Sequence, residues 1–238
     1  MGAVRAGARL AALALALAVG VMLHGLWRLV RAPSPWPRLF LALAARLFGA
    51  RPQVAGKPLR RNVVFLANHL SWMDIPLLAG ATGTAFVAKD DLADVPLIGW
   101  LCRLNRTIFI RRGDRMGVKA QVEDLRAALA DAWAVAIFPE GTTGDGDAIL
   151  PFKPSLLAAL DPPPPGLLIQ PVRIDYGAAT HELAWIGDEH GKDHALRVLR
   201  RPGRFVAHLH FLEPFAPSGD RKAIAAEARA RIVAAGAR

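Results

Sequence analysis

Apolar residues in this chain gather into short runs that polar loops separate. Runs that are rich in β-branched residues predict strands, and apolar positions that recur every three or four residues predict helices. The predicted strands are residues 63–67, 84–89, 107–112, 134–138, 167–176, 182–185 and 204–212. The predicted helices are residues 75–80, 91–104, 115–132, 194–201 and 220–235. This alternation predicts an α/β fold with a mixed, largely parallel sheet that helices flank.

The N-terminal part of the chain has a different pattern. Residues 10–27 contain no Asp, Glu, Lys or Arg, and arginines lie on both sides of them. A helix needs about 20 residues to span a bilayer, so we predict a membrane helix that is spanning or half-inserted, with a signal peptide as the alternative. After the proline-rich residues 33–37, residues 38–48 predict a helix that lies in the membrane interface or packs on the domain. The predicted division is membrane-associating helices in residues 1–58 and an α/β domain in residues 59–238.

The net charge of +10 is confined to the N-terminal part. Residues 1–61 carry ten of the 30 Lys and Arg residues and none of the 20 Asp and Glu residues, so the rest of the chain is balanced. Because this basic part is also the most apolar part, an anionic membrane surface fits it better than nucleic acid does. We therefore predict a membrane surface as a partner and no nucleic acid. The single cysteine, Cys102, excludes an intramolecular disulfide.

Polar residues follow the first strand of the α/β domain directly, in residues 68–74. His69 and Asp74 lie five positions apart, and Pro76 suits the first turn of a helix, so this segment predicts a loop between a strand and a helix. Asp74 is placed to accept a hydrogen bond from one ring nitrogen of His69 and leave the other free to take a proton. Taken alone the motif is weak, and the alternative is a structural histidine beside a helix-start carboxylate.

Three further polar blocks follow later strands, at residues 109–112, 138–143 and 170–172. With the first block they read N-H-x4-D, F-I-x-R, F-P-E-G-T and Pro-Val, in that order. Over residues 60–215 the chain thus resembles the glycerophospholipid acyltransferases, typified by 1-acylglycerol-3-phosphate acyltransferase. The resemblance implies an O-acyltransferase that moves a fatty acyl group from acyl-CoA or acyl carrier protein to the free hydroxyl of a lysophospholipid. The favoured acceptor is 1-acylglycerol-3-phosphate, which gives phosphatidate.

The resemblance also implies a role for each matching residue. His69 would act as the general base on the acceptor hydroxyl, and Asp74 would orient it. Arg112 would face the acceptor phosphate. Glu140, Gly141 and Thr142 would help to bind the head group of the acceptor. The remaining histidines show no metal-ligand spacing, and we predict no metal and no organic cofactor.

One position departs from the pattern of this family. The third block usually continues with Arg after Gly-Thr, whereas this chain has Thr143. The missing cation leaves a second acceptor open as the alternative, lyso-ornithine lipid, an amino-acid lipid that lacks the phosphate. If the acceptor is a phosphate monoester, Lys89 or Lys153 would have to supply the missing charge.

Two other classes of function are open alternatives. A lipid hydrolase would use Ser71 or Thr142 as a nucleophile, but the sequence lacks a G-x-S-x-G elbow. A non-enzymatic membrane lipid-binding protein would not need an intact His69 and Asp74. Because the lipid acceptor lies in a membrane, we predict a location at the bacterial inner membrane, with the catalytic domain on the cytoplasmic side.

Overall fold

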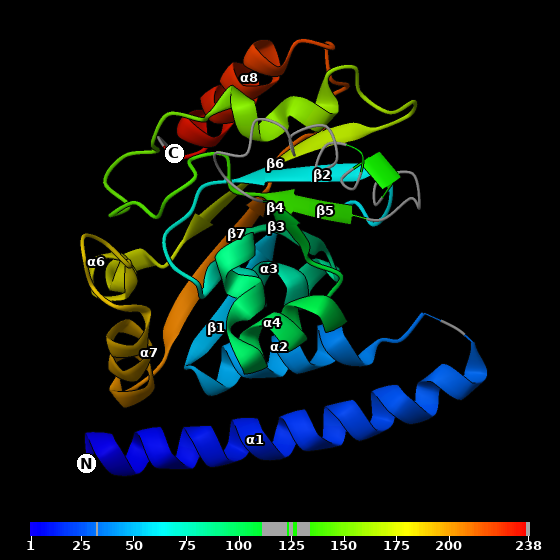
Figure 1. Ribbon diagram of the computed structural model, residues 1–238. Coiled ribbons are helices and arrows are strands. Elements are labelled where there is room, and N and C mark those ends of the chain that lie inside the picture. Colours follow the sequence, from blue (N-terminus) through cyan, green and yellow to red (C-terminus); the bar gives the residue numbers. More distant parts are fainter. Residues whose placement is uncertain (32, 111–122, 124–125, 128–133, 237–238) are drawn as a thin grey trace.

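A computed structural model describes residues 1–31, 33–110, 123, 126–127 and 134–236. The described residues form a seven-stranded sheet with the strand order β1-β7-β6-β2-β5-β3-β4 (Figure 1). The strands are β1 (Ala50–Ala55), β2 (Val63–Ala67), β3 (Ala85–Lys89), β4 (Ile108–Ile110), β5 (Ala134–Ile137), β6 (Leu168–Asp175) and β7 (Phe205–Phe211). Neighbouring strands are parallel except for β6 and β7, which pair antiparallel. The prediction of a mixed, largely parallel sheet is therefore confirmed.

Helices cover both faces of this sheet (Figure 1). The α-helices are α1 (Gly2–Trp27), α2 (Trp36–Leu47), α3 (Asp74–Thr82), α4 (Pro96–Leu104), α6 (Thr180–Leu183), α7 (Gly191–Arg200) and α8 (Arg221–Ala234). Two 3-10 segments also matter for the packing, η2 (Asp90–Asp94) and η3 (Pro154–Leu160). The helices α2 and α3 pack on one face, and α8 and η3 pack on the other.

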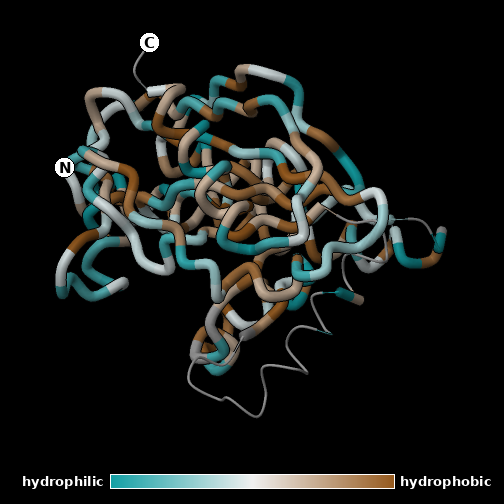
Figure 2. The backbone as a smooth tube through the Cα atoms, turned by 90° about the horizontal axis from the view of Figure 1, so that it is seen from above, coloured by the Kyte–Doolittle hydropathy of each residue, from teal (hydrophilic) through white to brown (hydrophobic). Residues whose placement is uncertain are grey.

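The strand β2 forms the centre of the core because both of its faces are covered. All five of its side chains are 0% exposed. Phe65 belongs to the apolar cluster that includes Leu77 and Leu78 of α3, whereas Leu66 belongs to the cluster under Ile224 of α8. A strand buried on both faces reads as a continuous apolar run, which is why the sequence predicted it. Hydrophobic stretches accordingly concentrate in the middle of the molecule (Figure 2).

Small residues let α2 and α3 lie close together. A Cβ atom at Gly80 of α3 would lie 2.7 Å from the Cα atom of Ala42 in α2, which no real side chain allows. Arg38 of α2 donates to the carbonyl oxygens of Gly80 and Ala81 at the end of α3. The helix predicted in residues 38–48 is therefore packed on the domain, which was one of its two alternatives.

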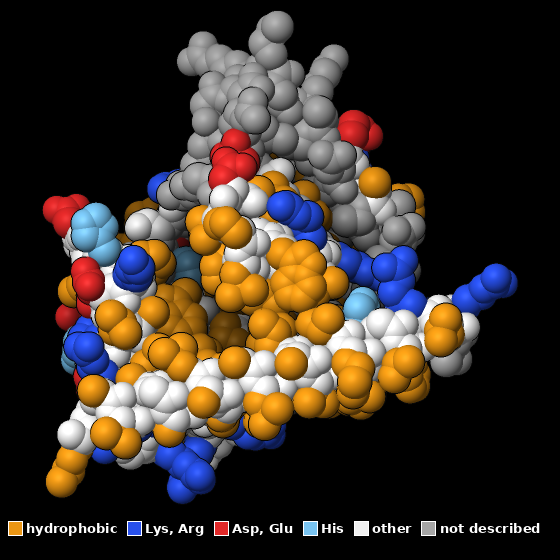
Figure 3. Space-filling view, turned by 60° about the horizontal axis from the view of Figure 1, so that its bottom comes forward, with side chains coloured by type: hydrophobic (Ala, Val, Ile, Leu, Met, Phe, Trp, Pro, Cys, Tyr) orange, Lys and Arg blue, Asp and Glu red, His pale blue; other side chains and the backbone are white. Residues whose placement is uncertain are grey.

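The long helix α1 lies across the outside of the domain, along α2 and α7 (Figure 1). It is long and apolar enough to cross a membrane, judged by its length and composition. Hydrophobic side chains line its outer side (Figure 3). The large exposed ones are Val4, Leu10, Leu15, Val19, Met22 and Leu26. Leu97, Ile98 and Trp100 of α4 are exposed hydrophobic residues as well.

The structure differs from the predicted elements at two places. Residues 50–55 form the edge strand β1, which pairs with β7, so the sheet includes a strand from the predicted N-terminal part. Residues 182–185 were predicted as a strand, but the helix α6 covers 182 and 183 and none of the four lies in a strand, so this prediction is wrong. The predicted helix over residues 115–132 lies almost entirely outside the described residues.

Candidate active site

The loop of residues 68–74, here the 68–74 loop, begins where β2 ends and runs directly into α3. Asn68 fixes its start, because its side-chain nitrogen donates to the Ile174 carbonyl at 2.9 Å and its oxygen accepts from the Ile174 N–H at 2.7 Å. Both bonds tie β2 to the neighbouring strand β6. The loop thus lies at the carboxyl end of two parallel strands, where ligands bind in open α/β sheets.

His69 and Asp74 form a hydrogen-bonded pair in this loop. The distance from His69 Nδ1 to Asp74 Oδ2 is 2.8 Å. Because a carboxylate only accepts, this bond places the ring proton on Nδ1 and leaves Nε2 as the acceptor. No described residue hydrogen-bonds that Nε2, and the His69 side chain is 19% exposed. This is the arrangement of a base held by an orienting carboxylate.

The carboxylate of Asp74 is fully buried and is satisfied by four donors. Its Oδ2 also accepts from the backbone N–H groups of Leu70 at 2.7 Å and Ser71 at 3.1 Å. Its Oδ1 accepts from the hydroxyl of Tyr176. A buried charge is costly unless it is hydrogen-bonded in this way. The Tyr176 hydroxyl is itself buried, and this burial raises its pKa well above its usual value. The charge of Asp74 is a further cause.

Aromatic rings hold the plane of the His69 ring. The ring stacks on Phe138, with centroids 4.1 Å apart and planes inclined by 15°. Phe138 stacks in turn on Phe86, with centroids 5.9 Å apart. Phe138 begins the third predicted block, so the structure brings the first and third blocks together. An imidazole held by both a hydrogen bond and a stacked ring is oriented before any substrate arrives.

Glu140 follows Phe138 by two positions in the third block and is 2% exposed. Its Oε1 has no hydrogen-bond partner among the described residues. Burial is the main cause that raises its pKa to about 8, and the charge of Asp74 adds to that effect. Backbone hydrogen bonds from His69 and Leu150, and the charge of Arg229, act in the opposite direction. Glu140 therefore keeps its proton at neutral pH.

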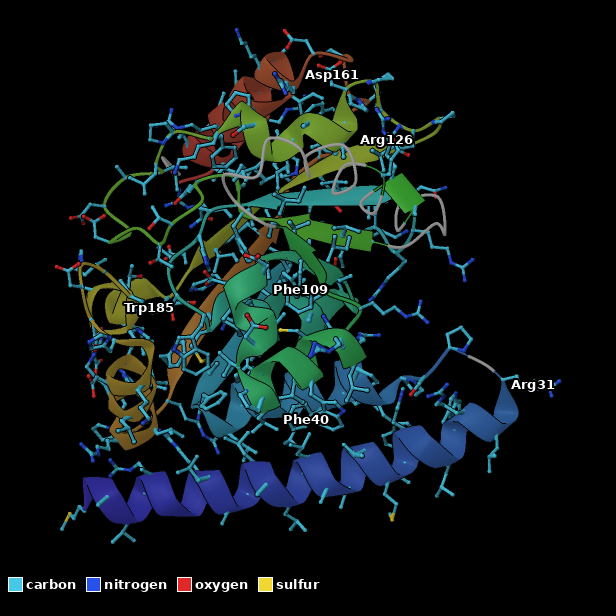
Figure 4. The ribbon with its side chains drawn as sticks, viewed as in Figure 1. Arg31, Phe40, Phe109, Arg126, Asp161 and Trp185 are labelled. Atoms are coloured by element: carbon cyan, nitrogen blue, oxygen red, sulfur yellow. The ribbon has the colours of Figure 1, made fainter. Side chains whose placement is uncertain are left out.

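The rest of the third block wraps around the 68–74 loop. The backbone N–H of Gly144 donates to the His69 carbonyl at 2.8 Å. The Thr143 hydroxyl donates to the backbone carbonyl of Trp185, and the Trp185 N–H donates to the Leu70 carbonyl at 2.9 Å. Trp185 lies beside α6, at the same end of the molecule as α7 (Figure 4). The side chain of Thr143 thus connects the third block to the segment after α6 that contains Trp185.

The predicted substrate-binding residues fall into three groups. Gly141 takes a positive φ of 69° at the start of its loop, and Thr142 is exposed. Glu140 is buried. Arg112 lies outside the described residues, so its predicted contact with a phosphate stays a prediction. Within the described part of the chain, no group of three or more His, Cys, Asp or Glu side chains is placed to hold a metal ion.

Sequence reasoning missed Tyr176 as a partner of Asp74. The two residues are 102 positions apart, and the contact depends on the pairing of β2 with β6. One signal was present, since Tyr176 is the only tyrosine in the sequence and follows a buried strand. A buried tyrosine hydroxyl usually has a hydrogen-bond partner.

The chain is similar to known proteins in both sequence and fold. The Acyltransferase family model matches residues 51–175. The chain is 35% identical over 241 aligned positions to the lyso-ornithine lipid O-acyltransferase of Rhodobacter capsulatus, covering 93% of this chain and 86% of that protein. It is 32% identical over 101 positions to the 1-acyl-sn-glycerol-3-phosphate acyltransferase of Neisseria gonorrhoeae, covering 42% of this chain and 40% of that one. The chain has the same fold as the 1-acyl-sn-glycerophosphate (LPA) acyltransferase PlsC from Thermotoga maritima, whose crystal structure is known. The TM-score is 0.64 at 23% sequence identity, and the match covers 100% of this chain and 99% of that chain.

Proposed function

The chain belongs to the acyltransferase family, and on that basis we propose that it transfers a fatty acyl group from a thioester donor to the hydroxyl of a lyso-ornithine lipid. It is an O-acyltransferase of the lysophospholipid type, as its family and its relatives show. The acceptor head group, the acyl donor and the roles of the residues are proposals. The observation that carries the proposed chemistry is the hydrogen bond between His69 and the buried Asp74.

In the proposed reaction, His69 Nε2 takes the proton of the acceptor hydroxyl as the oxygen attacks the thioester carbonyl. The acyl carbon–oxygen bond forms, the carbon–sulfur bond breaks, and the proton passes from His69 to the leaving thiolate. Asp74 stabilises the imidazolium that exists between the two proton transfers. A neutral histidine is suited to this task near neutral pH, and general-base catalysis contributes about 10²–10⁴ in rate.

Two observations favour a lyso-ornithine acceptor over the phosphate acceptor that the sequence alone favoured. In sequence, the lyso-ornithine lipid O-acyltransferase of Rhodobacter capsulatus matches 93% of the chain, whereas the 1-acyl-sn-glycerol-3-phosphate acyltransferase of Neisseria gonorrhoeae matches 42%. The position that usually holds an arginine is Thr143, and its hydroxyl is bonded to the Trp185 carbonyl. An ornithine head group offers a carboxylate and an ammonium, so it needs less positive charge from the protein than a phosphate monoester does. Asp145 and Asp147 are exposed, and we propose that they face the ammonium, although Asp147 also lies 3.4 Å from the exposed His181.

We propose that α1 lies in the membrane–water interface and brings the acceptor to the site. The helix presents its large apolar side chains outward along its whole length (Figure 3). Its inner side packs on α2 and α7, so it is joined to the catalytic domain along its length. The proposed donors, acyl-CoA or acyl carrier protein, are water-soluble thioesters. The proposed location is therefore the inner membrane, with the catalytic domain on the cytoplasmic side.

The test is an acyl-transfer assay with the purified full-length protein. Lyso-ornithine lipid and 1-acylglycerol-3-phosphate are supplied in parallel with the same acyl-CoA or acyl carrier protein donor, and the products are identified by mass spectrometry. We expect O-acylated ornithine lipid, and we expect the folded His69→Ala variant to lose at least 10²-fold in rate. Transfer to 1-acylglycerol-3-phosphate with none to lyso-ornithine lipid would refute the proposed acceptor.

The same assay addresses the hydrolase alternative. Ser71 is fully buried, and its hydroxyl accepts from the Met73 N–H, so it is poorly placed to attack a lipid. Free fatty acid that is released equally with and without an acceptor would support a hydrolase. Acylated product that depends on the acceptor supports the transferase.

A further inference from the structure

Trp72 connects the 68–74 loop to the helix α7, which lies more than a hundred residues later in the sequence. Its indole N–H donates to Nδ1 of His194 in α7 at 2.7 Å. Its ring also meets Phe48, at the end of α2, edge to face with centroids 4.8 Å apart. Trp72 lies between His69 and Asp74 in the sequence. A shift of its ring would therefore move the backbone that carries the proposed base.

The partners of His194 define its protonation state. The residue is 0% exposed. Its Nε2 lies 3.1 Å from the backbone carbonyl of Leu183, which only accepts, so Nε2 carries the proton. An indole N–H only donates, so Nδ1 of His194 must be unprotonated to receive it. Burial lowers the pKa of His194 and keeps this neutral form.

We propose that His194 is a positioning residue, which holds Trp72 and thereby fixes the 68–74 loop for acyl transfer. The proposal rests on His69 acting as the base. His194 touches neither His69 nor Asp74 in the described contacts, so it acts through Trp72. Because catalytic groups must stay within a fraction of an ångström of their productive position, loosening the loop costs activity even when the fold survives.

The helix α7 is itself firmly held, which a positioning element requires. Arg197 forms an ion pair with Glu189, with Nη2 and Oε2 2.6 Å apart. The guanidinium of Arg9 in α1 donates to the carbonyl oxygens of Val198 and Leu199, at 3.1 Å and 3.0 Å. These carbonyls belong to the C-terminal end of α7, where a cation is favourable. His194 thus lies on a helix whose C-terminal half is held by α1 and by the loop that precedes the helix.

Two substitutions of His194 separate its two hydrogen bonds. In His194→Asn the side-chain oxygen occupies the place of Nδ1 and still accepts from Trp72, but the bond to Leu183 is lost. In His194→Gln the side-chain nitrogen occupies the place of Nε2 and still donates to Leu183, but Trp72 loses its acceptor. Each variant leaves one buried polar group unpaired, so the two serve as matched controls for stability.

We expect His194→Gln to lower kcat by about ten- to a hundred-fold with KM changed less than about twofold, and His194→Asn to keep kcat within about threefold. Trp72→Phe removes the donor and should reproduce the effect of His194→Gln. Adding His194→Gln to Trp72→Phe should then cause no further loss, because both changes remove the same bond. Thermal unfolding of each variant shows whether it is folded.

A second readout does not depend on activity. The indole N–H resonance of Trp72, identified by its absence in Trp72→Phe, should move upfield in His194→Gln and stay in place in His194→Asn. Wild-type kcat in His194→Gln, or equal losses of kcat in the two His194 variants, would overturn the proposal. A failure of the proposed base appears separately, as activity that survives in the His69→Ala protein.

Discussion

Replacing Asp74 with asparagine removes the negative charge beside His69 and keeps the shape of the side chain. The surrounding contacts indicate how the new amide sits. Three N–H donors, those of His69, Leu70 and Ser71, converge on Oδ2, so the amide oxygen must take that position. The amide nitrogen then faces the hydroxyl of Tyr176, which is able to accept as well as donate. The variant therefore keeps the tautomer of His69 and should fold.

The expected loss of rate comes from the missing charge. During the reaction, the proposed base becomes an imidazolium next to the Asp74 carboxylate. Opposite charges about 4 Å apart attract by about 4 kcal/mol at an effective dielectric constant of about 20. That attraction corresponds to about 10³ in rate, since each 1.4 kcal/mol is about tenfold. We expect kcat to fall by about 10²–10³, with little change in KM because the attraction acts on an imidazolium that forms only as the reaction proceeds.

The assay is the initial rate of acyl transfer with purified protein, at saturating and limiting acceptor, for wild type, Asp74→Asn, His69→Ala and the double variant. If Asp74 acts through His69, Asp74→Asn costs little in the His69→Ala background. Thermal unfolding of each variant controls for loss of fold. An Asp74→Asn protein that stays within about threefold of wild type, while His69→Ala is inactive, would refute the reasoning.

Four further predictions follow from contacts in the structure. Tyr176→Phe should lower the free energy of unfolding by about 1.5–3 kcal/mol in chemical denaturation, because it removes a donor to a buried carboxylate. The Glu140 carboxyl has a pKa of about 8, against its usual 4.5. Between those two pH values the native protein keeps a proton that the unfolded chain releases. The free energy of unfolding therefore falls as the pH rises from about 4.5 to about 8. Glu140→Gln should therefore unfold at a higher temperature than wild type at pH 8, and the difference should shrink towards pH 5. Arg9 of α1 binds carbonyl oxygens at the end of α7. Arg9→Gln should therefore loosen α1 from the domain and speed proteolysis of the segment between α1 and α2. Full-length protein should stay bound to vesicles in about 1 M salt, because apolar contacts are not screened as charges are.

The central strands of the fold were predictable because strands that are buried on both faces consist of continuous apolar residues. The strands β2 and β5 are covered on both faces, and they appear as continuous apolar runs. The edge strand β1 gives no such signal, since only its first residue is buried and it contains Pro52. Proline is tolerated at a sheet edge, and the pairing of β1 with β7 spans about 150 positions. Local patterns do not contain that information.

The wrong strand at residues 182–185 has a similar origin. Four residues are too few to show a period, and Leu183 and Ala184 are both buried. The Ala184 N–H closes the helical turn by donating to the Thr180 carbonyl, and the Trp185 N–H then donates to Leu70 in the 68–74 loop. The proposed pair His69 and Asp74 was found from the sequence because the two residues are close in the chain. Tyr176 and His194 were not, because the fold alone brings them to the loop.

The two buried carboxyls of the site have opposite surroundings, and this contrast separates their roles. Asp74 accepts hydrogen bonds from four donors. Glu140 has an oxygen without a partner among the described residues, and its pKa is raised to about 8. Ionised Glu140 would place a second negative charge near His69 and Asp74, and that repulsion is one of the causes of its raised pKa. At neutral pH the site therefore holds a single carboxylate, and the imidazolium that the reaction forms has one defined counter-charge.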